Sequence, residues 1–185
     1  CQNKVIDDLK ELRQMYFKSV SYKYRGKNFD LRKDTHPNRL HGLIQHIRQE
    51  QELPCIYFCF SRRRCEELAQ ELLGFDFLQE GERDKILSLF DKLTSRYDLK
   101  HEPSASQIYP LISKGIAYHH AGMLPTLKEV IEQLFTSRLL KVIFTTETFA
   151  LGINMPARSV IFDELRKFYG NYVSNLKTRD FYQMA

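Results

Sequence analysis

Residues 55–73 have the sequence CIYFCFSRRRCEELAQELL, and this stretch decides the expected fold. Its first six residues form an unbroken apolar run, which is typical of a strand that is buried on both faces. Ser61 is a residue type that caps helices, and residues 62–73 carry apolar side chains at helical spacing. A buried strand followed directly by an amphipathic helix predicts one unit of a parallel sheet with crossover helices.

The same alternation continues along the chain. Further strands are expected at residues 115–119, 141–145 and 159–162, and further helices at residues 83–96, 106–113 and 124–135. We therefore predict an α/β fold, an open parallel sheet in three layers. In such sheets ligands bind beyond the carboxyl ends of the strands. The segments after Phe60, His119, Thr145 and Phe162 are accordingly expected to lie at one edge.

The first fifty residues differ from the rest in charge. They contain 11 Lys and Arg against 6 Asp and Glu, whereas residues 51–185 contain 17 of each, so the net charge of +5 lies in this segment. Aromatic residues such as Tyr22 and Tyr24 are interleaved with the basic ones, which is compatible with a nucleic-acid surface. A solvated, lysine-rich edge strand explains the pattern equally well. We expect helices at residues 5–16 and 37–49, a strand at residues 20–24 and a turn at residues 26–28.

Composition and cysteine spacing exclude several classes of protein. The chain has 185 residues, 43% of them apolar, and its longest clean apolar run has only six residues, which is too short to span a membrane. Its four cysteines form no Cys-x-x-Cys pair, and Cys55 and Cys59 would be about 13 Å apart on a strand. His119 and His120 are adjacent and would face opposite ways. The sequence therefore predicts no metal site and buried, reduced thiols.

Three segments after predicted strands contain polar groups suited to phosphate. Residues 61–64 are a serine and three arginines at a helix amino terminus, which together favour an anion. Residues 120–125 contain Gly122 immediately before another helix, and residues 146–156 combine hydroxyl groups, a glycine and an amide. Taken singly, each segment is also explained as a capped helix or an ordinary turn.

Together, however, the segments resemble a known family. The series FSRRRCEELAQEL, GIAYHHAGMLPTLKEVIEQLF, LLKVIFTTETFALGINMPARSVIF and RKFYG, ending at YQMA, is similar to the second RecA-like domain of DExH-box RNA helicases of the superkiller type, in superfamily 2. The resemblance covers residues 53–185. It implies that residues 51–185 form this domain and that residues 1–50 are an amino-terminal connection from the first motor domain.

The resemblance also implies roles for individual residues. The family's nucleic-acid-binding positions correspond to Ser61, Arg62, His120, Gly122, Thr146 and Glu147, whose main targets are backbone phosphates. The positions that face the nucleotide cleft correspond to Gly152, Asn154 and Gln183. ATP and Mg²⁺ are the implied cofactors, with Mg²⁺ held by the first motor domain.

The sequence departs from the complete helicase pattern in ways that bear on catalysis. It ends at Ala185, inside the sixth motif and before that motif's glycine and arginines, and it does not begin with Met. It contains neither a G-x-x-x-x-G-K-[ST] loop nor an Asp-Glu-x-His site. We therefore expect a fragment that carries no catalytic residue and hydrolyses no ATP by itself.

The leading functional hypothesis is the second motor domain of a 3′ to 5′ ATP-dependent RNA helicase. The implied partners are single-stranded RNA, the first motor domain of the same polypeptide and the RNA-decay machinery, in the cytoplasm or, in a eukaryote, the nucleus. One alternative is a noncatalytic nucleic-acid or protein interaction module on the same fold, and another is the motor of a related DNA helicase. A free-standing nucleotide-dependent transferase is disfavoured, because no Gly-rich cofactor loop follows any predicted strand.

Overall fold

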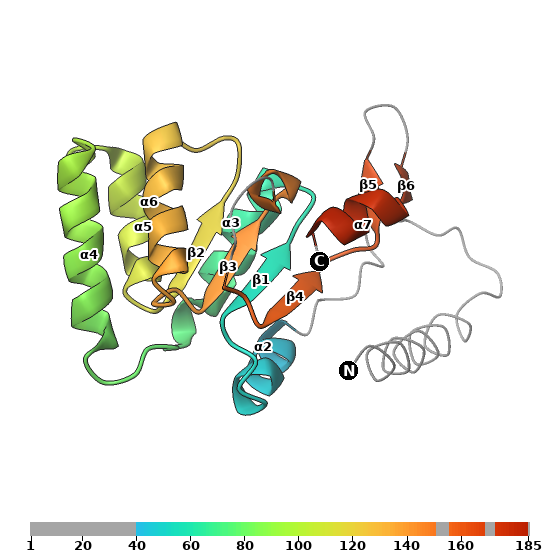
Figure 1. Cartoon of the computed structure of the whole chain (residues 1–185), viewed down its shortest axis with the longest axis horizontal. Helices are drawn as coiled ribbons and strands as arrows, with labels where there is room; N and C mark the ends of the chain where they lie inside the picture. The colour runs from blue at the N-terminus through green and yellow to red at the C-terminus, as the bar shows by residue number, and fades with distance from the viewer. Residues whose placement is uncertain (1–39, 151–155, 169–172, 185) are drawn as a thin grey trace. The chain divides into compact units, whose positions relative to one another are not determined.

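A parallel sheet of four strands forms the centre of the unit that begins at residue 38. The computed structural model describes residues 40–150, 156–168 and 173–184. The strands are β1 (Cys55–Phe58), β2 (Ile116–His119), β3 (Val142–Thr145) and β4 (Ser159–Phe162). They lie in the order β2, β3, β1, β4, and each neighbouring pair is parallel (Figure 1). The predicted parallel α/β sheet is confirmed.

Strand β1 is shorter than the apolar run that predicted it. Cys59 still donates its backbone N–H to the Thr145 carbonyl at 2.7 Å, but Phe60 is only half-buried and the chain is already turning. Ser61 then caps the next helix, as predicted, because its hydroxyl accepts the backbone N–H of Arg64 at 3.4 Å. The competing helix cap therefore ends the strand.

The helices, apart from the last one in the chain, follow the predicted order with small shifts at their ends. They are α2 (Leu40–Gln49), α3 (Arg62–Glu71), α4 (Glu82–Arg96), α5 (Pro103–Ile112), α6 (Pro125–Thr136) and α7 (Thr178–Met184), with 3₁₀ turns η1 (Leu72–Gly74) and η2 (Glu147–Ala150). Helix α5 begins three residues earlier than predicted, because Pro103 fits its first turn. It also accommodates Pro110 inside the helix.

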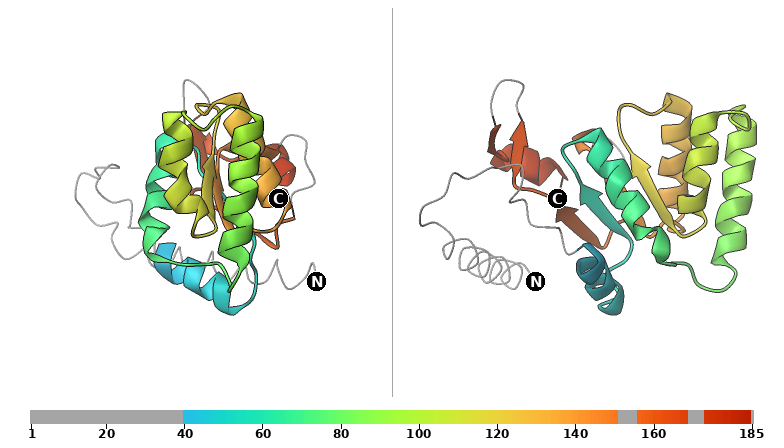
Figure 2. Two further views of the ribbon diagram at one scale, coloured as in Figure 1. Left: turned by 90° about the vertical axis from the view of Figure 1, so that its left-hand side faces the viewer. Right: turned by 180° about the vertical axis from the view of Figure 1, so that it is seen from behind.

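Two adjacent histidines show that helices cover both faces of the sheet. The His119 ring contacts Glu132 of α6, whereas the His120 ring contacts Glu66 of α3, both at 2.8 Å. Because neighbouring residues of an extended chain point to opposite sides, α6 and α3 lie on opposite faces. Seen from behind, α3 lies in front of the strands (Figure 2). The predicted three-layer arrangement and the opposite orientation of the two rings are therefore confirmed.

The core lies between these layers. All residues of β1, β2 and β3 are buried, including those of the edge strand β2, whereas the residues of β4, at the other edge, are half-buried. Aromatic rings pack across neighbouring strands, with centroid distances of 5.1 Å for Tyr57–Phe144 and 5.5 Å for Phe58–Phe162.

Helix α2 shares this core. Its buried side chains, Leu40, Ile44 and Ile47, are part of the same apolar cluster as the strands. By its internal contacts the chain divides into residues 1–37 and residues 38–185, and α2 belongs to the second unit. The elements that the sequence predicts within residues 5–28 lie outside the described residues.

A small ribbon and a terminal helix complete the described part of the chain. Strands β5 (Arg166–Phe168) and β6 (Val173–Asn175) pair antiparallel, and the Phe181 ring of α7 stacks on Phe162 at 5.0 Å. Sequence reasoning missed both the ribbon and α7. Three-residue strands are too short to show an alternating pattern, and α7 has only seven residues.

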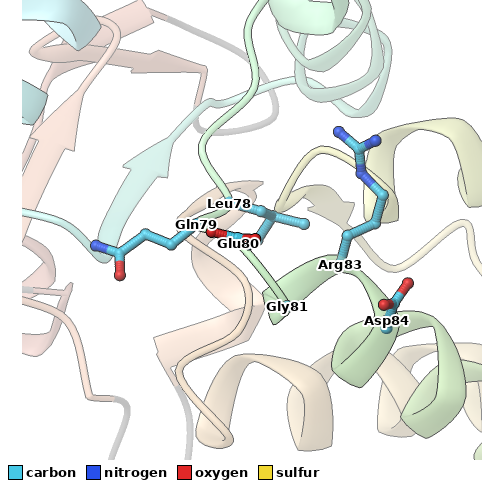
Figure 3. A pocket seen from close by; sticks show the side chains of 6 residues that line it. All are labelled: Leu78, Gln79, Glu80, Gly81, Arg83 and Asp84. Carbon is cyan, nitrogen blue, oxygen red and sulfur yellow. The ribbon is translucent and has the colours of Figure 1, made fainter.

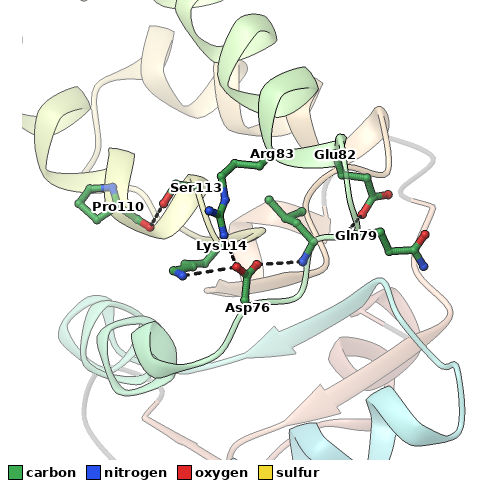
Figure 4. A network of polar contacts seen from close by, with 8 residues as sticks. Asp76, Gln79, Glu82, Arg83, Pro110, Ser113 and Lys114 are labelled. Atoms are coloured by element: carbon green, nitrogen blue, oxygen red, sulfur yellow. Dashed lines mark hydrogen bonds and ion pairs between the residues drawn. The ribbon is translucent and has the colours of Figure 1, made fainter.

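A polar network holds the loop before α4 against the amino ends of the strands. Asp76 accepts hydrogen bonds from the Leu78 backbone and from the side chains of Arg83 and Lys114 (Figure 4). Glu82 accepts the Gln79 N–H at 2.8 Å and pairs with Lys141 at 2.7 Å. Lys114 and Lys141 lie just before β2 and β3, so these bonds tie the loop to the start of the sheet.

We expect the folded chain to lose stability in acid, because folding favours the ionised forms of Asp76 and Glu82. Partial burial raises the pKa of Asp76 and of Glu82, but hydrogen bonds and nearby cations outweigh it and hold both pKa values below the ordinary range. This stabilisation is complete above the unfolded pKa of about 4 and is lost as pH falls through the lower folded values. Thermal unfolding measured from pH 6 to pH 3 should therefore show a falling midpoint, and the slope should be smaller in Asp76→Asn/Glu82→Gln. An unchanged slope would contradict this assignment.

Candidate nucleic-acid interface

The four strands of the sheet end at the same level. His119 of β2 is in register with Thr145 of β3, which is in register with Phe58 of β1, and Phe58 is in register with Phe162 of β4. The segments that follow the strands therefore meet at one edge, as expected from a parallel sheet. Among the predicted binding residues, this edge contains Ser61, Arg62, His120, Gly122, Thr146 and Glu147.

Arg62 lies directly against the turn after β2. A Cβ atom placed on Gly122 would be 3.2 Å from Arg62 Cδ and 3.3 Å from Arg62 Nη1. This spacing is tighter than ordinary side-chain contacts, so glycine allows the arginine to approach the backbone of the turn. Arg62 and Gly122 are both exposed, and so are the neighbouring Ser61 and Ala121. The edge thus presents Arg62, the Ser61 cap and the turn at residues 121–122 to solvent.

The turn after β2 is fixed by the buried side chain of His120. The Gly122 N–H donates to His120 Nδ1 at 3.2 Å, and the Met123 N–H donates to the His120 carbonyl at 3.1 Å. On the other side of the ring, His120 Nε2 lies 2.8 Å from Glu66 Oε1. Tyr118 stacks on the imidazole at 5.5 Å. His120 therefore shapes the turn from inside, and the amides at 122 and 123 have partners within the turn.

The turn after β3 is attached to His119. The Thr146 N–H donates to the His119 carbonyl at 3.3 Å, and Thr145 Oγ1 donates to the same carbonyl at 2.8 Å. Phe149 of η2 packs edge-on against the His119 ring at 4.6 Å. Burial lowers the pKa of His119, although Glu132 opposes this shift, so the ring is neutral at pH 7. Thr146 and Glu147 therefore follow a backbone that is hydrogen-bonded to the end of β2.

A third polar group, which sequence reasoning missed, locks α3 to β4. Asp163 accepts a hydrogen bond from the Tyr57 hydroxyl at 3.0 Å and from Arg64 Nε at 3.0 Å. Its side chain is only 7% exposed. Burial and the Asp163 carboxylate raise the pKa of Tyr57, which keeps its hydroxyl protonated as a donor. An aspartate directly after a predicted strand was the available signal, since such positions lie at the binding edge.

The residues predicted to face the nucleotide have no described side chains. Gly152 and Asn154 lie outside the described residues. Gln183 lies in α7, but its side chain is not described. Their assignment to a nucleotide cleft remains a prediction from the sequence.

Two hollows in the described part of the chain lie away from this edge. One of about 350 Å³ is lined by Leu78, Gln79, Glu80, Gly81, Arg83 and Asp84 (Figure 3). Another, of about 400 Å³, is lined by Gln45, Arg48, Gln49 and Phe75. The first adjoins the network at the amino ends of the strands, and the second lies beside α2, which precedes β1. Neither contains a predicted binding residue, so the candidate interface is an exposed edge rather than either of these pockets.

Cys55, Cys59 and Cys65 are buried free thiols, as predicted. Burial raises the pKa of Cys55 to about 12, so this thiol stays protonated. Within residues 40–150, 156–168 and 173–184, no group of three or more His, Cys, Asp or Glu side chains could hold a metal ion. In the same ranges no helix has the length and apolar character that crossing a membrane requires.

Comparison with known proteins gives the family. No family model matches the chain, but several curated proteins do. ATP-dependent RNA helicase mtr4 of Schizosaccharomyces pombe is 39% identical over 151 residues, 80% of this chain and 14% of that protein. Antiviral helicase SKI2 of Saccharomyces cerevisiae is 42% identical over 147 residues, 77% of this chain and 11% of that protein. Superkiller complex protein 2 of Homo sapiens is 39% identical over 146 residues, 78% of this chain and 12% of that protein.

The chain thus spans between a tenth and a seventh of these relatives. Its parallel sheet and crossover helices agree with a RecA-like helicase domain. On this identity over most of its length, the chain belongs to the superkiller-type DExH-box RNA helicases of superfamily 2.

Proposed function

We propose that this chain is the second motor domain of an ATP-dependent RNA helicase that moves 3′ to 5′. In this proposal it supplies part of the track for the RNA backbone and one wall of the ATP cleft. The observation that carries it is the meeting of Arg62, Gly122 and Thr146 at the carboxyl edge of a RecA-like sheet. The relatives that match the chain, among them ATP-dependent RNA helicase mtr4, suggest the class of substrate and cofactor.

The chemistry of the edge suits phosphates more than bases. Arg62 is a cation at the first residue of α3, where the helix dipole also favours an anion. It is exposed, as is the Ser61 cap. Thr146 and Glu147 are half-exposed on the neighbouring segment. Contacts of this kind position a strand without reading its sequence.

The ATP side of the proposal rests on the sequence. Gly152, Asn154 and Gln183 would face the nucleotide, and the first motor domain would hold Mg²⁺. ATP binding would close the two domains on single-stranded RNA, and hydrolysis would release them. Residues 1–50 would form the connection from the first motor domain, with α2 at its end packed in the core of this domain. The chain would hydrolyse no ATP by itself, and the longer protein would act with the RNA-decay machinery inside the cell.

The experiment that tests the RNA track is a measurement of binding to a single-stranded oligouridylate over a range of salt concentrations. We expect Arg62→Ala/Thr146→Ala to bind more weakly and to show a salt slope smaller by about 0.7, since one phosphate contact is lost from a single strand. The matched control is Arg48→Ala, because Arg48 is an exposed arginine on α2, away from this edge. An unchanged slope in the double variant would place the RNA elsewhere.

A noncatalytic interaction module would give a different result. It would bind RNA through the same edge, but no first motor domain would restore ATP hydrolysis. We expect that RNA stimulates ATP hydrolysis by the longer protein and that this activity is lost when the first motor domain is removed.

A further inference from the structure

Helix α3 contains two arginines that are each followed, four residues later, by a glutamate. Such pairs lie on the same side of a helix and normally form ion pairs. Arg63 and Glu67 do so, with Arg63 Nε 2.6 Å from Glu67 Oε1. Arg62 and Glu66 have the same spacing, yet no ion pair joins them in the described part of the chain. Two equivalent pairs on one helix therefore behave differently.

The difference is explained by His120, because its ring contacts the Glu66 carboxylate. The Gly122 N–H donates to His120 Nδ1, so this nitrogen carries no proton and the ring proton lies on Nε2. Nε2 can then donate to Glu66 Oε1 at 2.8 Å. The imidazole is 5% exposed and stacks on Tyr118, which holds it in place. Glu66 is thus drawn toward the turn after β2.

The contact between His120 and Glu66 matters because Arg62 lies against the same turn. The Arg62 Cδ and Nη1 atoms lie against Gly122, in the same turn that His120 shapes. If Glu66 were not held by His120, its spacing of four residues would let it pair with Arg62 and compete with any phosphate for the guanidinium. Because Glu66 pairs with His120 instead, the charge of Arg62 stays available at the exposed edge.

We propose that His120 is a positioning residue that keeps Glu66 from pairing with Arg62, so that Arg62 can bind a backbone phosphate of RNA. This inference rests on the proposed function of the edge and adds to it the control of its arginine. His120 itself touches no RNA in this proposal. Its two ring nitrogens do separate tasks, one shaping the turn and the other holding the glutamate.

The test separates these two tasks with His120→Asn. An asparagine can still accept the N–H two residues later, as in an Asx turn, but it is too short to replace the Nε2 contact. Binding of the single-stranded oligouridylate should weaken about two- to fivefold, the effect of one exposed ion pair that competes with the ligand. Adding Glu66→Gln should restore the affinity, because the competing charge is gone. Glu67→Gln is the matched charge control on α3. Added to His120→Asn, it should raise the affinity by no more than it does in the parent chain.

The outcomes distinguish the inference from the function on which it rests. If Arg62→Ala leaves RNA binding unchanged, the proposed track fails and the inference fails with it. If Arg62→Ala weakens binding but His120→Asn does not, the inference alone is overturned. It is also overturned if His120→Asn weakens binding and Glu66→Gln gives no rescue, because His120 would then act only through the fold. In the Arg62→Ala background, His120→Asn should have no further effect.

Discussion

Replacing Asp163 by alanine is expected to lower the free energy of unfolding by about 2 to 3 kcal/mol. Removing one partner of a buried ion pair typically costs about 3 to 5 kcal/mol, and the value is reduced here because the Arg64 side chain is 35% exposed and reaches water. The Tyr57 hydroxyl loses its acceptor in the same variant. Chemical denaturation followed by circular dichroism measures the loss directly.

Two smaller substitutions serve as controls for this prediction. Tyr57→Phe removes the hydrogen bond to Asp163 and should cost about 1 kcal/mol. Glu67→Ala breaks the exposed Arg63–Glu67 pair on the same helix and should cost at most about 0.5 kcal/mol. If Asp163→Ala is no more harmful than Glu67→Ala, the contact between α3 and β4 contributes little to stability.

The second large effect is expected in the longer protein, where Thr146→Ala and Asn154→Ala should impair different steps. Thr146 is assigned to the RNA side, so its loss should weaken RNA stimulation while basal ATP hydrolysis survives. Asn154 is assigned to the nucleotide side, so its loss should mainly raise the ATP concentration that gives half-maximal rate. Losing one or two hydrogen bonds costs about 1 to 3 kcal/mol, roughly a five- to hundredfold effect in steady-state kinetics.

Thermal stability is the control for this pair of variants. The same kinetic defect in both, with normal unfolding midpoints, would show that residues 146–154 have no separate RNA and nucleotide ends. Unfolding of both would indicate that these side chains act as cap and turn residues only. The expected split, by contrast, would make one short segment the link between ATP occupancy and the RNA track.

Local features of the fold were predictable from the sequence, and long-range ones were not. The cap at Ser61 depends on residues within one turn of it, and the buried strand at Cys55 is visible as an apolar run. The hydrogen bonds of Asp163 with Tyr57 and Arg64 form because the pairing of β1 with β4 brings these residues together. No periodic pattern encodes that pairing, so the sequence placed Asp163 at the right edge without giving its partners.

The same reason limits what the sequence says about the candidate interface. Because parallel strands end at the same edge of a sheet, the sequence predicted that Arg62, Gly122 and Thr146 lie at one edge. It did not show that the His120 ring is buried or that it contacts Glu66, because both depend on how α3 lies over β2. The opposite orientation of His119 and His120 was predictable, since it follows from neighbouring positions on an extended chain.

The central position of β1 has a consequence for how the chain folds. Its first residue, Cys55, pairs with Val142 on one side and with Ser159 on the other. Both edges of the strand therefore stay unpaired during synthesis until most of the chain has left the ribosome. Contacts so distant in sequence close slowly, and an apolar strand with two open edges is prone to aggregate in the meantime. The segment that specifies the fold is thus also the one that most needs protection while folding is incomplete.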